Sequence, residues 1–334
     1  MNEMLSLSIK ELEMLLTEMG AKPFAAKQLK SWLIKGVPFE DMTNLPKELR
    51  EKLRNTHHEG YAHVAEKHIA KDGTIKLLLA LHGGGLVECV VMQYHHGRTL
   101  CVSTQLGCGM GCAFCASGAN GLVRNLTTGE MMAQLIAAKE DGDISNVVLM
   151  GSGEPLDNLD NVLAFVSALQ LDFGIGLRHV SLSTCGLVPG IKKLAEKGLP
   201  LTLCISLHAA TDEKRRVIMP VARAYSVKQI IAAAAEYFKK TGRRVIIEYT
   251  LIRGFNDSAE DRSALKQLLR GLNCHINVIP LNEAVGSFIP PSEKEAYAFV
   301  AALEKEGLSA TMRRALGGEI EGACGQLKLK REGQ

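Results

Sequence analysis

The stretch that decides the fold runs from residue 105 to residue 118 and reads Gln-Leu-Gly-Cys-Gly-Met-Gly-Cys-Ala-Phe-Cys-Ala-Ser-Gly. Its three cysteines, Cys108, Cys112 and Cys115, follow a C-x3-C-x2-C spacing with glycines around them. Because glycine tolerates positive φ, the backbone can wrap tightly and aim three sulfurs at one small object. Thiolates are soft ligands that suit iron–sulfur clusters or zinc. The stretch therefore predicts a metal site.

The number of thiolates favours a cluster over zinc. A [4Fe–4S] cluster needs four ligands, so three local cysteines leave one iron open to a ligand from outside the protein. A structural zinc site usually has four protein ligands, and no fourth cysteine or histidine lies near this stretch. Phe114 lies between the last two cysteines and can shield the cluster from water. The pattern resembles the signature of radical S-adenosylmethionine (SAM) enzymes, in which the amino acid part of SAM chelates the open iron.

The composition describes an ordinary globular chain. Its 334 residues allow one large domain and a smaller one, with 46% hydrophobic residues and a formal net charge of +3. This small charge permits an RNA partner without demanding one. No apolar run approaches the ~20 residues of a membrane span, and the first residues lack a signal-peptide pattern. Nine cysteines in such a chain indicate a reducing compartment, so we expect a cytoplasmic protein with no membrane contact.

Apolar periodicity divides the chain into three parts. Residues 1–60 read as a helical accessory domain, with helices near 8–19, 25–34 and 46–53. Residues 61–98 read as a β-strand extension, with strands at 74–81 and 86–94. Residues 99–330 alternate strands and helices, which is typical of a parallel sheet covered by helices. In this part we expect strands at 99–104, 146–150, 179–183, 201–206, 245–251, 275–279 and 310–313, and helices near 128–141, 158–171, 189–197, 226–240, 258–271 and 292–306.

About seven such strands suit a full or partial (β/α) barrel. The predicted fold class is therefore α/β, a partial (β/α) barrel core with a small N-terminal helical module and a β extension. In such a barrel the site lies at the C-terminal ends of the strands. Polar groups follow these ends at Gly153 and Glu154, Ser183, Ser206-Leu207-His208, and Asn282. Each alone would more often be a helix cap or loop residue, but together, beside a cysteine loop, they indicate a pocket for SAM.

Three other residues have a chemical and an ordinary interpretation. Cys324 lies in a glycine-flanked loop after the last strand, which suits a catalytic thiol about as well as a structural one. Cys101 precedes the cysteine loop and would ordinarily be a core thiol. Glu88 is an acid inside an apolar strand and would ordinarily face solvent. The remaining cysteines are expected to be small core residues: Cys89, Cys185, Cys204 and Cys274.

Together these motifs resemble those of the RlmN-type RNA adenine methyltransferases, radical SAM enzymes with the Cfr methyltransferases as close relatives. The resemblance covers residues 46–327 and rests on Thr99–Cys108, the three cluster cysteines, Gly153-Glu-Pro-Leu, Leu182-Ser-Thr, Ile205-Ser-Leu-His-Ala and Ala323-Cys-Gly-Gln-Leu. It implies a [4Fe–4S] cluster on Cys108, Cys112 and Cys115. It also implies SAM contacts from Gly153, Glu154, Ser183, Ser206, Leu207, His208 and Asn282.

The resemblance also gives roles to the three ambiguous residues. One SAM would methylate the Cys324 thiolate, and a radical made from a second SAM would take hydrogen from that methyl group. The carbon radical would add to carbon 2 of adenine, and Glu88 would remove the ring proton as general base. Cys101 would then attack the Cys324 sulfur and release the product, leaving a disulfide bond.

The partners that the resemblance implies are 23S ribosomal RNA near the peptidyl transferase centre, tRNA beside the anticodon, and an electron donor such as flavodoxin or ferredoxin. A monomer is expected. The nearest alternative is Cfr-like methylation of carbon 8. The motif Gly153-Glu-Pro-Leu favours the RlmN type over this alternative. An activase for a glycyl radical protein would leave Cys101, Cys324 and Glu88 without a role. A zinc-bearing RNA-binding module would contain zinc in place of iron and sulfide.

Overall fold

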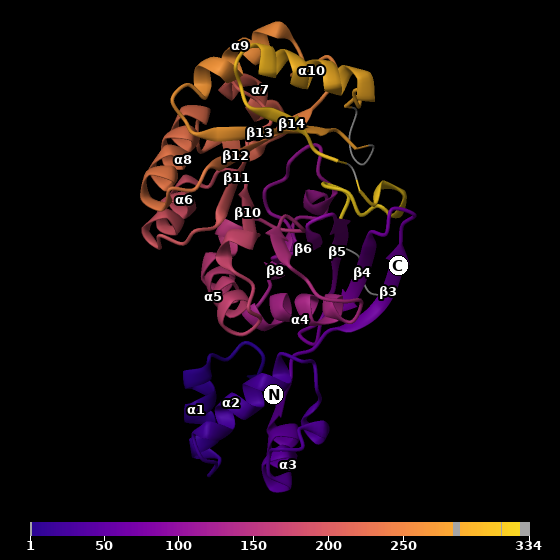
Figure 1. Ribbon diagram of the computed structural model, residues 1–334, viewed down its shortest axis with the longest axis vertical. Coiled ribbons are helices and arrows are strands. Elements are labelled where there is room, and N and C mark those ends of the chain that lie inside the picture. Colours follow the sequence, from indigo (N-terminus) through magenta and orange to yellow (C-terminus); the bar gives the residue numbers. More distant parts are fainter. Residues whose placement is uncertain (1, 283–287, 315, 328–334) are drawn as a thin grey trace.

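The computed structural model describes residues 2–282, 288–314 and 316–327, and its N-terminal module lies at one end of the molecule (Figure 1). As predicted, this module is helical, and Ser8 caps its first helix through a capping box with Glu11. The short strands β1 and β2 pair in parallel and close the module. Its elements are β1 (Asn2–Glu3), α1 (Ile9–Glu18), α2 (Phe24–Leu33), η1 (Phe39–Asp41), α3 (Lys47–Thr56) and β2 (His57–His58).

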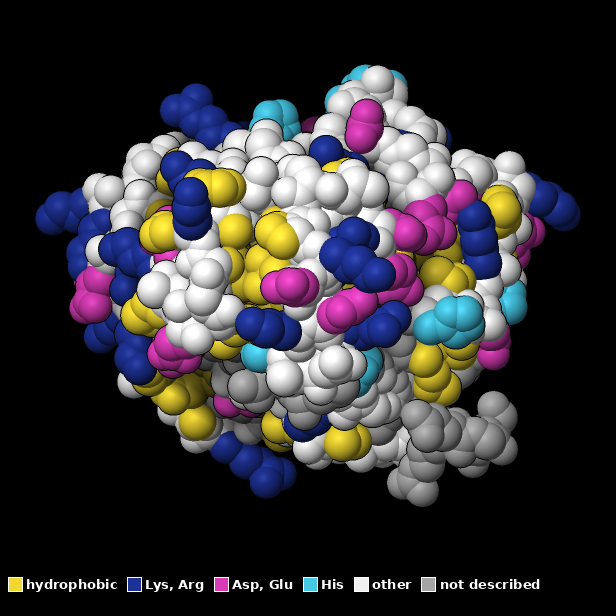
Figure 2. Space-filling model, turned by 90° about the horizontal axis from the view of Figure 1, so that it is seen from below, with side chains coloured by type: hydrophobic (Ala, Val, Ile, Leu, Met, Phe, Trp, Pro, Cys, Tyr) yellow, Lys and Arg dark blue, Asp and Glu magenta, His cyan; other side chains and the backbone are white. Residues whose placement is uncertain are grey.

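Polar contacts tie the module to the rest of the chain. The Thr127 hydroxyl, at the start of the first core helix, donates to a Glu3 carboxylate oxygen at 2.9 Å. The buried Lys30 ammonium pairs with Asp172 at 3.3 Å. Seen from the end at which the module lies, basic and acidic side chains are interspersed (Figure 2). This end of the molecule therefore offers no uniform basic face, in line with the small net charge.

The strands of the core and of the β extension form one sheet. Among the described residues it has ten strands in the order β14-β13-β12-β11-β10-β9-β6-β5-β4-β3. Strands β6 and β9 to β14 are parallel, and β3, β4 and β5 continue the sheet with antiparallel pairing. Their bounds are β3 (His63–Ile69), β4 (Ile75–Ala80), β5 (Leu86–Tyr94), β6 (Gly97–Cys101), β9 (Asn146–Leu149), β10 (Val180–Thr184), β11 (Thr202–Ser206), β12 (Val245–Leu251), β13 (Cys274–Pro280) and β14 (Ala310–Met312).

Because β14 and β3 are the two edges, the sheet is open, which confirms a partial barrel rather than a closed one. The predicted strands and helices lie where the pattern places them, within a few residues. The pattern placed no strand at β3, although it assigned this part of the chain to strands, and it missed α7 and the hairpin of β7 and β8. The helices and remaining elements are β7 (Gln105–Gly107), η2 (Ala116–Gly118), β8 (Leu122–Asn125), α4 (Thr128–Lys139), η3 (Pro155–Asn158), α5 (Leu159–Leu171), η4 (Leu177–His179), α6 (Val188–Glu196), α7 (Asp212–Ile218), η5 (Pro220–Arg223), α8 (Val227–Thr241), α9 (Ala259–Leu268), α10 (Glu293–Lys305) and η6 (Gly318–Ile320).

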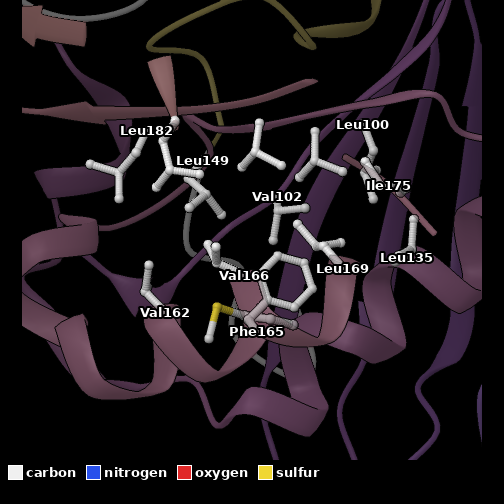
Figure 3. Packing of buried hydrophobic residues seen from close by; sticks show 14 of the residues in the cluster. Leu100, Val102, Leu135, Leu149, Val162, Phe165, Val166, Leu169, Ile175 and Leu182 are labelled. Carbon is white, nitrogen blue, oxygen red and sulfur yellow. The ribbon is translucent and has the colours of Figure 1, made fainter. Parts of the chain in front are cut away.

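Helices pack on the sheet through branched and aromatic side chains (Figure 3). Phe165 and Val166 of α5 are almost fully buried against Leu149 and Leu182 of the parallel strands. Truncating a buried phenylalanine to alanine typically costs about 3–5 kcal/mol, so this layer contributes substantially to the stability of the fold. No helix among the described residues is long and apolar enough to span a membrane.

Candidate active site

The cysteine loop follows β7, which pairs with β8 in a separate two-stranded sheet, and the loop is held from both sides. The Cys108 N–H donates to the Gly121 carbonyl at 3.0 Å, and the Ala113 N–H donates to the Ile218 carbonyl at 2.9 Å. Gly107 has φ +74°, and a Cβ there would lie 2.0 Å from the Gly121 oxygen. Only glycine fits this position, because any side chain would collide with the Gly121 carbonyl oxygen.

The three cysteines line one open cavity of about 930 Å³ at the C-terminal ends of the strands. Burial, with a smaller effect of the neighbouring Cys115, raises the pKa of the Cys108 thiol to about 11, and burial likewise raises the pKa of Cys112. Thiols with raised pKa values lose their protons when they bind a metal centre, because the positive metal stabilises the thiolates. The three cysteines therefore fit an iron–sulfur cluster.

The predicted residues at the strand ends line the same cavity, with one exception. Gly153, Glu154, Ser183, Ser206, His208 and Asn282 all lie in its wall. The Leu207 side chain is fully buried in the core instead, so Leu207 can meet a ligand only through its backbone. Cys185, predicted to be a core residue, also lines the cavity although it is 6% exposed. Cys89 and Cys204 are buried as predicted, and Cys274 is half-buried.

His208 is held as a neutral imidazole. Burial lowers its pKa to about 3. Its Nδ1 accepts the Thr250 N–H at 2.9 Å, so its remaining proton is on Nε2. The ring meets Phe114 edge-on at 4.9 Å between centroids. His208 also has φ +57°, a conformation that a non-glycine residue adopts only where the surroundings hold it.

Glu154 is a fixed carboxylate in the cavity wall. It accepts the Leu156 N–H at 3.0 Å and the Cys185 N–H at 2.7 Å. Burial raises the pKa of Glu154, and these N–H donors oppose that effect. Gly153 beside it has φ +108°, and a Cβ there would lie 2.7 Å from the Gln105 side chain. Only glycine therefore packs against Gln105 at this position, and the adjacent Glu154 lines the cavity as a partner for a cationic group.

Two buried charged residues of the cavity wall were missed by sequence reasoning. The Glu248 carboxylate on β12 accepts the Ser183 hydroxyl at 2.5 Å and the Ser206 hydroxyl at 3.1 Å. Its other oxygen pairs with the Arg313 guanidinium at 3.2 Å. An acid inside the apolar run 245–251 was the available signal. Glu248 therefore joins Ser183 and Ser206, both predicted SAM contacts, and the Arg313 guanidinium in one hydrogen-bond network.

Cys101 and Cys324 lie at a second cavity of about 700 Å³, and Cys324 lines both cavities. Cys101 at the end of β6 and Cys324 in the C-terminal loop therefore lie in the same cavity, as expected for the two ends of an almost closed barrel. Burial raises the pKa of Cys101 to about 12, with a further effect from Cys324. Burial also raises the pKa of Cys324, while the Arg313 guanidinium opposes it. All nine cysteines are described, and none of them forms a disulfide in this structure.

The loop that carries Cys324 is anchored at both ends. Near the thiol, the Asn282 amide donates to the Cys324 carbonyl at 3.0 Å, and the Ser117 hydroxyl donates to the Leu327 carbonyl at 2.8 Å. Asn282, predicted as a SAM contact, therefore also binds this loop. At the other end, Asp72 in the β3–β4 turn accepts the Gly317 N–H at 2.9 Å. Residues 328–330, the end of the predicted core, lie outside the described residues.

We expect Asp72→Ala to loosen this loop without unfolding the protein. Partial burial acts to raise the pKa of Asp72, but N–H donors from Gly317 and Thr74 outweigh it and lower the pKa. The anchor is thus complete above the usual aspartate pKa and weakens as pH falls through the lowered value. Losing these bonds should cost about 1–2 kcal/mol locally, or roughly five- to thirtyfold faster amide exchange over 316–327. Lys71→Ala, in the same turn, should leave exchange unchanged because its ion pair is exposed.

Glu88 is buried rather than solvent-facing. It is 3% exposed and pairs with the Lys76 ammonium at 3.4 Å. Because Val90 is registered opposite Cys101, Glu88 lies on the same face of the sheet as Cys101. It lines neither cavity in this state. The ordinary interpretation of Glu88 is therefore wrong, and its role as a base stays a prediction.

The fold and the site together define the class of this chain. An open parallel sheet carries a three-cysteine loop above a cavity lined by polar strand ends, which is the architecture of radical SAM enzymes. Residues 102–265 match the radical SAM superfamily. Residues 2–58 match the ribosomal RNA large subunit methyltransferase N-terminal domain.

The relatives narrow the class to one family. The chain is 47% identical over 336 residues to the probable dual-specificity RNA methyltransferase RlmN of Clostridium perfringens (strain SM101 / Type A), covering 98% of this chain and 97% of the relative. It is 48% identical over 335 residues to the protein of the same name in Alkaliphilus oremlandii (strain OhILAs), covering 98% of each. A radical SAM methyltransferase crystal structure from Sphaerobacter thermophilus matches with a TM-score of 0.94 and 39% identity, over 99% and 100% of the two chains. The chain belongs to the RlmN family of radical SAM RNA methyltransferases, and its cofactors are a [4Fe–4S] cluster and SAM.

Proposed function

We propose that the protein methylates carbon 2 of adenosine in 23S ribosomal RNA and in tRNA next to the anticodon, with Cys324 as methyl carrier. The observation that carries the proposal is that Cys324 lines both cavities. One cavity has the polar wall that suits SAM, and the other holds Cys101. The Cys324 thiol, at the wall that the two cavities share, can receive a methyl group from SAM in the first cavity. Cys101 in the second cavity can then attack the Cys324 sulfur and release the product.

The polar wall suits SAM through its charges. Cys108, Cys112 and Cys115 would hold the cluster, which supplies the one-electron reduction of SAM when bound. Glu154 is a buried carboxylate suited to the ammonium group of SAM. Ser183 and Ser206 offer hydroxyls already aligned by Glu248. Neutral His208 contributes packing and an N–H donor without adding a positive charge near a sulfonium.

The second cavity suits the later steps. Arg313 lines both cavities and pairs with Glu248, so a fixed cation lies at the wall that Cys324 shares. A cation there favours the Cys324 thiolate, the form that accepts a methyl group. Cys101 lines the same cavity and would attack the Cys324 sulfur to release product. Glu88 would serve as the base after a shift that separates it from Lys76, since it lines neither cavity now.

The remaining parts of the proposal follow from the family and the composition. We propose a cytoplasmic monomer with an accessory domain at 1–60, a β extension at 61–98 and a core at 99–330. An electron donor such as flavodoxin or ferredoxin would reduce the cluster. The names of the relatives, which are RlmN proteins, support carbon 2 over the Cfr-like alternative.

Nucleoside analysis tests the proposal. RNA from cells with and without the gene is digested and measured by mass spectrometry, with 23S ribosomal RNA and tRNA fractions kept apart. We expect 2-methyladenosine in both fractions, lost on deletion and restored by the wild-type gene but not by Cys324→Ala. If 8-methyladenosine is the product that disappears, the enzyme is Cfr-like. If neither nucleoside changes, adenosine is not the substrate.

A further inference from the structure

The outer side of the cysteine loop carries unusual surface chemistry. Among the described residues, few large hydrophobic side chains are strongly exposed, and three of these lie beside this loop. They are Leu122 and Val123 on β8, 42% and 61% exposed, and Val217 on α7, 61% exposed. Aliphatic side chains gathered at the surface around one loop usually mark a contact with another molecule.

The strand β8 covers the first half of the loop. The Cys108 N–H donates to the Gly121 carbonyl at 3.0 Å, immediately before Leu122. A Cβ built on Gly109 would lie 3.6 Å from the Leu122 Cβ. Gly121 and Leu122 therefore lie directly against the loop at the cluster ligand Cys108 and its neighbour Gly109, and Val123 follows on the same strand.

The end of α7 covers the second half of the loop. The Ala113 N–H, next to the cluster ligand Cys112, donates to the Ile218 carbonyl at 2.9 Å. A Cβ on Gly111 would lie 3.7 Å from the Pro220 ring. Gly109 and Gly111 are themselves exposed, so no side chain covers the loop at these two positions. A partner protein can therefore contact the backbone of the cysteine loop directly at these two glycines.

The charge beside the aliphatic residues is positive. Arg216 on α7 and Arg223 on η5 are both exposed, and neither enters an ion pair with the residues that the structure describes. The acids of α7, Asp212 and Glu213, lie one turn before Arg216 and Val217, and Asp212 accepts the Val227 N–H. The two arginines are therefore free for a partner that is negatively charged.

We propose that Leu122, Val123, Arg216, Val217 and Arg223 form the docking surface for an acidic one-electron donor protein. This loop-flank surface rests on the proposed function, because only a cluster in the loop needs an electron from outside. Redox encounters use small interfaces with an apolar centre and complementary charges, which speed association. RNA is the less suitable occupant, because RNA sites rely on aromatic stacking and dense positive charge, and these side chains are aliphatic.

Two donors separate docking from chemistry. The variants Val123→Glu and Arg216→Glu place a negative charge on the surface, and Leu171→Glu places one on α5, at a side chain that is 78% exposed. With a purified acidic flavodoxin as donor, we expect SAM cleavage by the two surface variants to fall about tenfold or more, since charge mainly sets association. With dithionite, a small reductant that needs no docking, their rates should equal wild type. Leu171→Glu should match wild type with both donors.

Binding provides a readout that does not depend on the cluster. Flavodoxin binding to the immobilised cluster-free protein should weaken for Val123→Glu and Arg216→Glu and lose its salt dependence for Arg216→Glu. Unchanged flavodoxin binding would overturn the proposal, and if RNA affinity fell instead, the surface would belong to RNA. A wild-type protein that binds flavodoxin at this surface but cleaves no SAM with dithionite would refute the proposed function and leave the docking surface standing.

Discussion

Cys112→Ala is expected to abolish cluster binding and every trace of SAM cleavage while the protein stays folded. Three thiolates with one open iron position leave no spare ligand, so removing one exposes a second iron to solvent. Cys112 lies at the cavity wall, with Cys108 and Cys115 as its ionisable neighbours. Its side chain packs only at the margin of a small apolar cluster, so the loss of one sulfur should not disturb the sheet. Iron and sulfide analysis after anaerobic reconstitution measures the first effect, and 5′-deoxyadenosine release measures the second.

Cys274→Ala is the matched control for this experiment. It removes one thiol at the start of β13, away from both cavities of the site. Its iron content and SAM cleavage should equal wild type. If Cys112→Ala keeps wild-type iron, sulfide and cleavage, the cysteine loop is not the cluster site, whatever the chain's relatives do.

The fold was predictable because its signals are local. Strand β12 is expected at 245–251 from apolar β-prone residues, and the structure has it at Val245–Leu251. The cysteine spacing and the polar strand ends likewise need no tertiary information. The helix α7 was missed because its sequence, Asp-Glu-Lys-Arg-Arg-Val-Ile, shows almost no apolar periodicity. It is held by tertiary contacts, among them the fully buried Arg215, which donates to the Leu207 carbonyl at 3.0 Å, and a local pattern does not contain such contacts.

The finer parts of the site depend on which face of a strand turns inward. Glu88 and Glu248 are both acids within apolar strands, and the sequence alone suggests the solvent face for either. Both are buried, since Lys76 pairs with Glu88, and Arg313 and two serines satisfy Glu248. These partners are distant in sequence, so no local pattern reveals them. The bond between Asp72 and Gly317 joins residues 245 positions apart and was equally hidden.

Cys101→Ala is expected to stop the enzyme after less than one turnover and leave it covalently joined to RNA through Cys324. Cys101 is 7% exposed and lines the cavity that Cys324 also lines. Cys324 is an ionisable neighbour of Cys101, although the two residues are more than two hundred positions apart in the sequence. A carbon radical that adds to adenine leaves RNA bonded to the Cys324 sulfur through a methylene group. Only a thiolate attack on that sulfur releases the product. Among the described residues, the thiols that line this cavity with Cys324 are Cys101 and the cluster ligand Cys115, which leaves Cys101 to attack.

The adduct should appear as an RNA-sized gel shift that nuclease removes and reductant does not, because a thioether resists thiols. Cys89→Ala is the matched control: Cys89 is a buried thiol on the neighbouring strand β5, registered opposite Leu77, and its side chain packs in the main core on the other face. It should turn over as wild type does and form no adduct. Cys101→Ala combined with Cys324→Ala should give neither adduct nor product, since no methyl carrier remains. Free methylated RNA over many turnovers of Cys101→Ala would show instead that Cys101 is a core thiol and that another group resolves the intermediate.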